Sequence, residues 1–364
     1  MNYPARLQGL QKDFSGLGFD VLLISHLPNV RYLCGFTGSS GVLVVSPEAC
    51  FFFTDGRYKQ QSRDEVKGAK VVIGQRSALA SAAEWFAKRR KTSNSKGWKL
   101  GIEGEHFIVA DRRRLISMLP KYVHVREAPP LTERARMIKD EEEISLMHEA
   151  ARMGAGLLDH AFASIRGGAT EIEAAARMEF AARKAGADSM SFETIIASGV
   201  RSALPHGRAS ESPISAGGFV VCDFGVILHG YCSDRTRTVY VGSATREARR
   251  TYGAVLEAQL AAIDAVQPGA SVGSVDQAAR KVLQKNGLAK YFTHSTGHGV
   301  GLEIHEAPRV AKGQPELLYP GMVITVEPGA YLPGKWGVRI EDMVVVTEHG
   351  CEVLEPTQKE FIVI

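Results

Sequence analysis

Short apolar runs alternate with amphipathic stretches through the first third of the chain. The runs are residues 21–24, 42–45, 51–54, 71–73 and 100–102, and a helical pattern occupies residues 78–90. This alternation predicts strands and helices of an α/β domain with a mixed sheet. The double proline at Pro129 and Pro130 breaks the pattern and predicts a domain boundary, which divides the chain into residues 1–130 and 131–364.

Helical patterns and β-hairpin patterns alternate in the second part, which predicts an α+β domain. Three sites have the spacing of a capping box, in which a polar cap residue precedes Glu or Gln by three positions. They are Asp140 with Glu143, Thr170 with Glu173, and Ser274 with Gln277. Each predicts the start of a helix.

Two acidic residues belong to the first predicted hairpin. Residues 221–224 and 232–240 are rich in β-branched and aromatic side chains, as strands are. If the chain turns at Leu228 and His229, Asp223 lies opposite Asp234 and both point to the same face.

Two further acids belong to a second predicted hairpin. A turn centred on Gly334 places Glu327 opposite Glu341. A register slip of one residue would turn either acid to the other face, so the pairing is a sharp prediction.

The second part also contains an internal repeat. The sequence GAT at 168–170 leads into a helical pattern, and GAS at 269–271 leads into another. Each is followed by one of the acid-bearing hairpins. We therefore expect a duplicated unit of helix, helix and hairpin, related by a pseudo-twofold axis and giving one carboxylate pair per copy to a shared cleft.

Composition narrows the class of protein. The length of 364 residues suits two domains, and the net charge of +4 is too small to indicate nucleic-acid binding. No run of about 18 apolar residues exists to cross a membrane, and the first residues lack a secretory signal, so we expect a cytoplasmic protein. The basic run at 88–91 is interpreted as a solvated helix end. Five cysteines without CxxC spacing argue against a disulfide framework and a thiolate zinc site.

Buried carboxylates repel one another and become protonated unless cations are present. Two divalent ions would balance four carboxylates. His298, bracketed by Gly297 and Gly299, adds one imidazole to the oxygen donors. This donor set favours manganese, with cobalt, zinc or iron as alternatives. Such a centre activates water and polarises a carbonyl group, which is hydrolytic chemistry.

Three further residues are candidates for the cleft. His206, His305 and Arg339 could bind substrate or stabilise a reaction intermediate. The alternatives are a surface histidine, a supporting histidine and an arginine that neutralises the acids. The other histidines, His294 among them, are interpreted as packed or solvated.

The motifs that carry these residues resemble those of the pita-bread metallopeptidase family, in its aminopeptidase P and prolidase branch. They are DFG at 223–225, SDRTRT at 233–238, HGVG at 298–301 with HEAP at 305–308, VEPG at 326–329 and RIED at 339–342. GFTGS at 35–39 and FTDGRY at 53–58 resemble the creatinase-like N-terminal domain of that branch.

The resemblance implies a role for each residue. Asp223 would chelate one metal ion, His298 and Glu327 the other, and Asp234 and Glu341 both. Glu327 would also carry a proton to the leaving nitrogen, while His206, His305 and Arg339 would serve the substrate.

The implied enzyme is a dinuclear Xaa-Pro aminopeptidase, in which a metal-bridging hydroxide cleaves a peptide with proline in second position. A strict Xaa-Pro dipeptidase, or prolidase, is the alternative, and a non-catalytic protein-binding module is a distant one. The resemblance also implies a homodimer.

Overall fold

The computed structural model describes residues 1–88 and 97–364. The chain divides into two compact units, Met1–Arg136 and Met137–Ile364. Residues 89–90 of the predicted helix, and 89–91 of the basic run, lie outside the described residues. No helix in the described ranges combines the length and apolar character needed to cross a membrane.

The first unit is an α/β domain with a mixed sheet, as predicted, and the sheet has six strands, one more than the five predicted runs. Its strand order is β4-β3-β2-β1-β5-β6. The strands are β1 (Val21–Ile24), β2 (Val42–Val45), β3 (Cys50–Asp55), β4 (Lys70–Gly74), β5 (Trp98–Glu103) and β6 (Val123–Ala128). The helices are α1 (Tyr3–Ser15), α2 (Leu27–Cys34), α3 (Lys59–Glu65), α4 (Ala78–Ala87), α5 (Val109–Met118) and α6 (Leu131–Met137), with a 3₁₀ turn, η1, at Gly56–Tyr58. Phe53 and Phe86 pack in its core.

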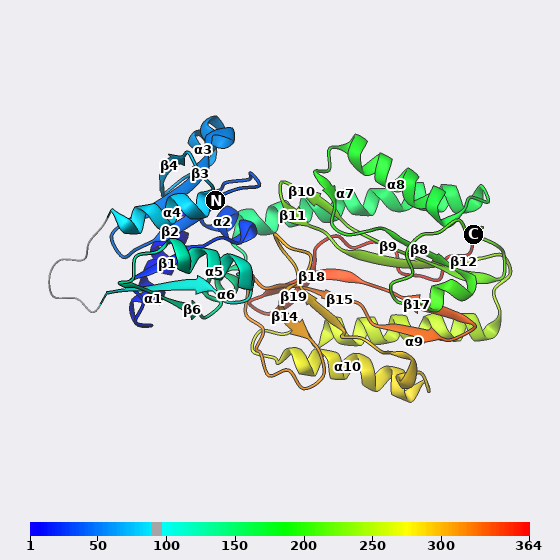
Figure 1. Cartoon of the computed structure of the whole chain (residues 1–364). Coiled ribbons are helices and arrows are strands. Elements are labelled where there is room, and N and C mark those ends of the chain that lie inside the picture. Colours follow the sequence, from blue (N-terminus) through cyan, green and yellow to red (C-terminus); the bar gives the residue numbers. More distant parts are fainter. Residues whose placement is uncertain (89–96) are drawn as a thin grey trace. The chain divides into compact units, whose positions relative to one another are not determined.

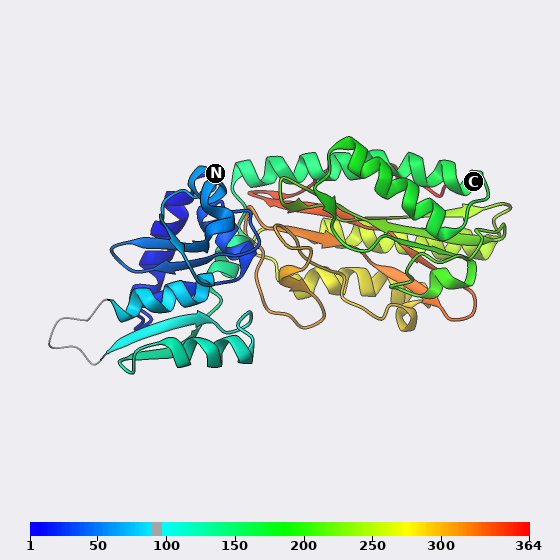
Figure 2. The same cartoon turned by 45° about the horizontal axis from the view of Figure 1, so that its top comes forward.

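The second unit repeats the order helix, helix, hairpin, as predicted. The first copy contains α7 (Glu141–Arg166), α8 (Glu171–Ala185), β9 (Gly218–Phe224) and β12 (Arg235–Val241). The second contains α9 (Arg246–Asp264), α10 (Val272–Lys285), β15 (Val323–Val326) and β18 (Asp342–Thr347). Figures 1 and 2 show α7 and α8 on one side of the strands and α9 and α10 on the other. Each helix pair packs on its own hydrophobic cluster.

Shorter strands complete the sheets of this unit. The sheets have the orders β12-β9-β8, β11-β10-β7 and β14-β13-β15-β18-β19, and β16 pairs with β17. The remaining elements are β7 (Ser189–Met190), β8 (Ile195–Ser198), η2 (Gly199–Ala203), β10 (Val226–Leu228), β11 (Tyr231–Cys232), η3 (Ala289–Tyr291), β13 (Gly297–Gly299), β14 (Glu306–Val310), β16 (Gly329–Leu332), β17 (Trp336–Arg339) and β19 (Gly350–Val353).

Two of the three predicted capping boxes are confirmed. Asp140 caps α7 and Thr170 caps α8, each with the reciprocal bond from Glu three residues on. The third is wrong, because α10 begins at Val272 and its cap is Ser271. The Ser271 side chain accepts from the amide of Ser274, which therefore lies inside the first turn.

The register of the first acidic hairpin differs from the prediction. Asp223 pairs with Thr236 rather than with Asp234. His229 and Gly230 have φ values of 50° and 81° and form the two central residues of a tight turn, one position later than expected. Moving the turn by one residue shifts the partner by two, so Asp234 stays on the same face but lies diagonally from Asp223.

The register of the second hairpin is confirmed. Val326 pairs with Asp342, and Gly329 pairs with Arg339. Glu327 and Glu341 occupy the short gap between these paired segments and keep the same register.

Candidate metal centre and active site

The first hairpin contributes two buried carboxylates. Asp223 lies near the end of β9, and Asp234 lies in the connection between β11 and β12. Gly225 permits this connection, because a Cβ atom there would lie 1.8 Å from the carbonyl oxygen of Ser233. The close approach of these two backbone segments sets the position of Asp234.

The second hairpin contributes Glu327 after β15 and Glu341 before β18. Thr236, the strand partner of Asp223, ties the two hairpins together. Its Oγ1 donates to Glu341 Oε2 at 2.6 Å, and its carbonyl oxygen accepts from the Glu341 amide at 3.2 Å. The two carboxylate pairs therefore meet across one hydrogen-bonded junction.

His298 on β13 faces these acids. Its Nε2 atom lies 3.5 Å from Asp234 Oδ2 and 3.6 Å from Glu327 Oε1. Its Nδ1 donates to the carbonyl oxygen of Gly299 at 2.9 Å, which leaves the Nε2 lone pair toward the carboxylates. Burial lowers the pKa of His298 to about 4, so the ring is neutral, the form that binds a metal ion.

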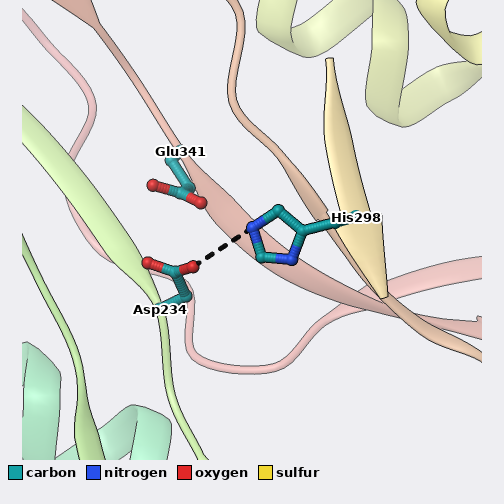
Figure 3. Close-up of side chains that lie close together, drawn as sticks. All are labelled: Asp234, His298 and Glu341. Carbon is teal, nitrogen blue, oxygen red and sulfur yellow. Dashed lines mark ion pairs between the residues drawn. The ribbon is translucent and has the colours of Figure 1, made fainter. Parts of the chain in front are cut away.

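Asp234, His298 and Glu341 form a compact donor group. One donor atom from each lies within 4.8 Å of the others, and Figure 3 shows the three side chains converging. Burial raises the pKa values of Asp234 and Glu341 well above their ordinary range, and neighbouring carboxylates raise them further. Burial also raises the pKa of Glu327 to about 7. These acids ionise together only if positive charge is added.

One buried atom indicates where such charge fits. Asp223 Oδ1 makes no hydrogen bond within the described part of the chain, whereas Oδ2 accepts from Arg339. A buried carboxylate oxygen without a partner is costly, and a divalent ion would satisfy it. The residues present therefore fit a centre for hard or borderline divalent ions.

The acids open onto a cavity of about 760 Å³. Its wall contains all eight predicted site residues: His206, Asp223, Asp234, His298, His305, Glu327, Arg339 and Glu341. The structure thus brings together segments that are far apart in the sequence. The apolar residues Phe192, Ile195 and Ile304 also line the cavity.

Arg339 connects the acids to a buried polar network. Its guanidinium donates to Asp223, to Tyr331 Oη at 2.6 Å and to Thr236 Oγ1 at 3.0 Å. His294 Nε2 lies 2.9 Å from Tyr331 Oη. Arg339 lines the cavity and pairs with a buried carboxylate, and its role toward substrate stays a prediction.

His294 is a cavity residue that sequence reasoning missed, and Arg309 is another. His294 lines the cavity, and its Nδ1 lies 3.9 Å from Glu327 Oε2. Burial, followed by the charge of Arg339, lowers its pKa to about 4. Its position four residues before His298 was the available signal, because both flank the same glycine-containing segment.

His305 and His206 lie on the more open part of the wall. The His305 ring contacts the His298 ring with centroids 4.4 Å apart. Burial, followed by the charge of His206, lowers the pKa of His305. Both histidines are exposed enough to meet a ligand.

Comparison with known proteins agrees with this geometry. Residues 145–348 match the model of metallopeptidase family M24, and residues 6–138 match the creatinase/prolidase N-terminal domain. The chain belongs to metallopeptidase family M24. It is a metallo-exopeptidase of the Xaa-Pro dipeptidase and aminopeptidase type, with the pita-bread fold.

Similar M24 proteins include both types. An Xaa-Pro dipeptidase of Pyrococcus furiosus is 36% identical over 360 residues, covering 98% of this chain and 99% of its own. The structure of an Xaa-Pro dipeptidase from Bacillus anthracis is 38% identical, with a TM-score of 0.93 and 100% of both chains covered. The structure of an X-Pro aminopeptidase from Thermotoga maritima is 33% identical, with a TM-score of 0.87, covering 97% of this chain and 100% of the other.

Proposed function

We propose that this M24 protein is an Xaa-Pro dipeptidase that uses two divalent metal ions. The observation that carries the metal-dependent chemistry is the group of four carboxylates around neutral His298 on one cavity wall. The sequence motifs place the aminopeptidase first and the dipeptidase second. We reverse that order because similar proteins named Xaa-Pro dipeptidase match this chain over nearly its whole length.

The family resemblance assigns the five donors to two ions. Asp223 would hold one ion, His298 and Glu327 the other, and Asp234 and Glu341 would contact both. When bound, the ions supply Lewis acidity and lower the pKa of water toward neutrality. Manganese is the first candidate, with cobalt, zinc and iron as alternatives.

The chain's own side chains complete the reaction. Glu327 lines the cavity beside His298, and it would accept a proton from water and deliver it to the leaving proline nitrogen. His206 and His305 donate to the scissile carbonyl as charge develops on its oxygen. Arg339 contacts Asp223 directly and orients its carboxylate.

A cationic residue on the wall favours a dipeptide. Arg309 lines the cavity and lies directly opposite His298 in the β13–β14 pair, so both side chains point to the same face. Its guanidinium makes no ion pair or side-chain hydrogen bond within residues 1–88 and 97–364. A dipeptide ends in a carboxylate at proline, which a guanidinium binds in bidentate geometry.

Replacing Arg309 tests this assignment. We expect Arg309→Met to raise KM for an Xaa-Pro dipeptide about tenfold or more, the worth of one charge-assisted hydrogen bond. The comparison substrate is an Xaa-Pro amide, in which a neutral amide replaces the terminal carboxylate. Its KM should change little. Arg309→Lys is the matched control that keeps the charge. Equal effects on both substrates would contradict the role of Arg309.

An Xaa-Pro aminopeptidase is the second candidate, supported by the full-length similarity to the Thermotoga maritima structure. Steady-state rates with an Xaa-Pro dipeptide and an Xaa-Pro-Yaa tripeptide distinguish the two. A larger kcat/KM for the tripeptide would overturn the dipeptidase proposal. The cytoplasmic location and the homodimer stay predictions.

A further inference from the structure

The segment that carries His206 has little secondary structure to hold it. We call residues 204–208 the His206 loop; it follows η2 and precedes β9, and it makes no strand pairing. His206 and Arg208 from this loop line the cavity. An exposed loop without such pairing is mobile unless side chains restrain it. Inside the loop the Gly207 amide donates to the carbonyl oxygen of Leu204 at 3.0 Å, which shapes the turn around His206. The place of this turn relative to the cavity therefore depends on contacts from outside the loop.

Two arginines hold the loop, one on each side of His206. Arg339 Nη1 donates to the carbonyl oxygen of Pro205 at 2.9 Å. Arg201 Nη2 donates to the carbonyl oxygen of Arg208 at 2.6 Å. The first anchor comes from the candidate active site itself. The second comes from η2, on the N-terminal side of the loop.

Glu171 fixes the second anchor. This first residue of α8 is fully buried, and its Oε2 accepts from Arg201 Nε at 3.0 Å. The same carboxylate accepts from the Ser198 amide at 2.7 Å and the Ser198 hydroxyl at 2.9 Å. It also accepts from the Ser210 amide at 3.2 Å and the Ser210 hydroxyl at 2.7 Å. Ser198 precedes the loop and Ser210 follows it. One carboxylate thus joins both ends of the loop to a helix.

We propose that Glu171 and Arg201 are positioning residues that hold His206 in place for substrate binding. Neither residue supplies a metal donor in the proposed centre. Their effect on turnover passes through the His206 loop. The proposal rests on the proposed function, because the substrate contact of His206 belongs to it.

A double-mutant cycle distinguishes a positioning role of Arg201 from a purely structural one. The cycle compares wild type, Arg201→Ala, His206→Ala and the double variant by kcat and KM on an Xaa-Pro dipeptide. If Arg201 acts through His206, Arg201→Ala lowers kcat/KM about tenfold in the wild type but less than about threefold in the His206→Ala background. Metal content by elemental analysis stays at the wild-type level.

Controls separate positioning from loss of folding. Arg152→Ala removes an exposed guanidinium 3.6 Å from Glu355, away from the cavity, and should leave both kinetic constants unchanged. The thermal midpoint is measured for every variant. If Arg201→Ala fails to fold, Glu171→Gln replaces it in the same cycle, because it keeps the side-chain volume and removes the charge.

The outcomes are distinct. Wild-type protein that fails to cleave Xaa-Pro peptides refutes the proposed function. If the wild type is active and Arg201→Ala lowers kcat/KM by the same factor with or without His206, the positioning role is refuted. A His206→Ala variant with normal kinetics refutes it as well. A loss of kcat/KM that occurs only when His206 is present supports the positioning role.

Discussion

At the scale of single residues, the candidate active site contains buried acids whose ionised forms are favourable only when cations are present. Burial raises the pKa of Asp234, and Glu341 beside it raises that pKa further. Arg339 contacts Asp223 and not Asp234. Metal binding and the ionisation of these acids are therefore one coupled process.

Asp234→Asn should separate activity from stability. It replaces a charged donor of the proposed metal centre by a neutral amide, so we expect metal affinity and kcat to fall by about a hundredfold or more. It also removes a like charge, so the metal-free variant should unfold at a higher temperature than metal-free wild type. The measurements are turnover, metal content and thermal unfolding with a chelator present.

His349→Ala is the control for this variant, because His349 is exposed at the β18–β19 turn, away from the cavity. It should match wild type in all three measurements. Near-normal turnover in Asp234→Asn would argue against the metal centre.

At the scale of elements, the two hairpins set the spacing of the acids. The second keeps one register through the gap that contains Glu327 and Glu341. The first breaks between β11 and β12, and Gly225 allows Asp234 to lie in that break. A Cβ atom at Gly225 would meet backbone, which cannot move aside as a flexible side chain can.

Gly225→Ala should displace the connection that holds Asp234. We expect stability to fall by about 2 kcal/mol or more and metal affinity to fall with it. Gly253→Ala is the matched control, because Gly253 lies in α9 with open space around its Cβ position. That change should stabilise by about 0.5–1 kcal/mol. Equal stability changes in urea unfolding would contradict the close-packing argument.

At the scale of the whole molecule, removing metal should make stability depend on pH. The folded state raises the pKa of Glu327 from 4.5 to about 7, so the fold of the metal-free protein favours the protonated acid. The contribution of protonated Glu327 to the stability of the metal-free fold is present below pH 4.5 and is lost as pH rises through about 7. Asp234 and Glu341 shift in the same direction.

Bound metal opposes this loss because it favours the ionised acids. The gap between the thermal midpoints of the metal-loaded and chelated protein should therefore widen from pH 4.5 to pH 7. Thermal unfolding at several pH values measures that gap. A gap that does not change with pH would contradict the charge argument.

The sequence by itself determined the elements and the chemical inventory. Apolar runs predicted five of the six strands of the first unit, and capping boxes at Asp140 and Thr170 predicted two helix starts, because these signals act over a few residues. Alternation along a strand set which acids share a face, and it survived the error in the first hairpin, because a turn shifted by one residue preserves the face.

Tertiary structure decided what depends on contacts between distant segments. It placed Asp223 opposite Thr236, because the conformation of His229 and Gly230 chose the turn. It brought His294 into the cavity wall through Tyr331, and it anchored the His206 loop through Glu171. Such contacts follow from packing in three dimensions, and no local pattern encodes them.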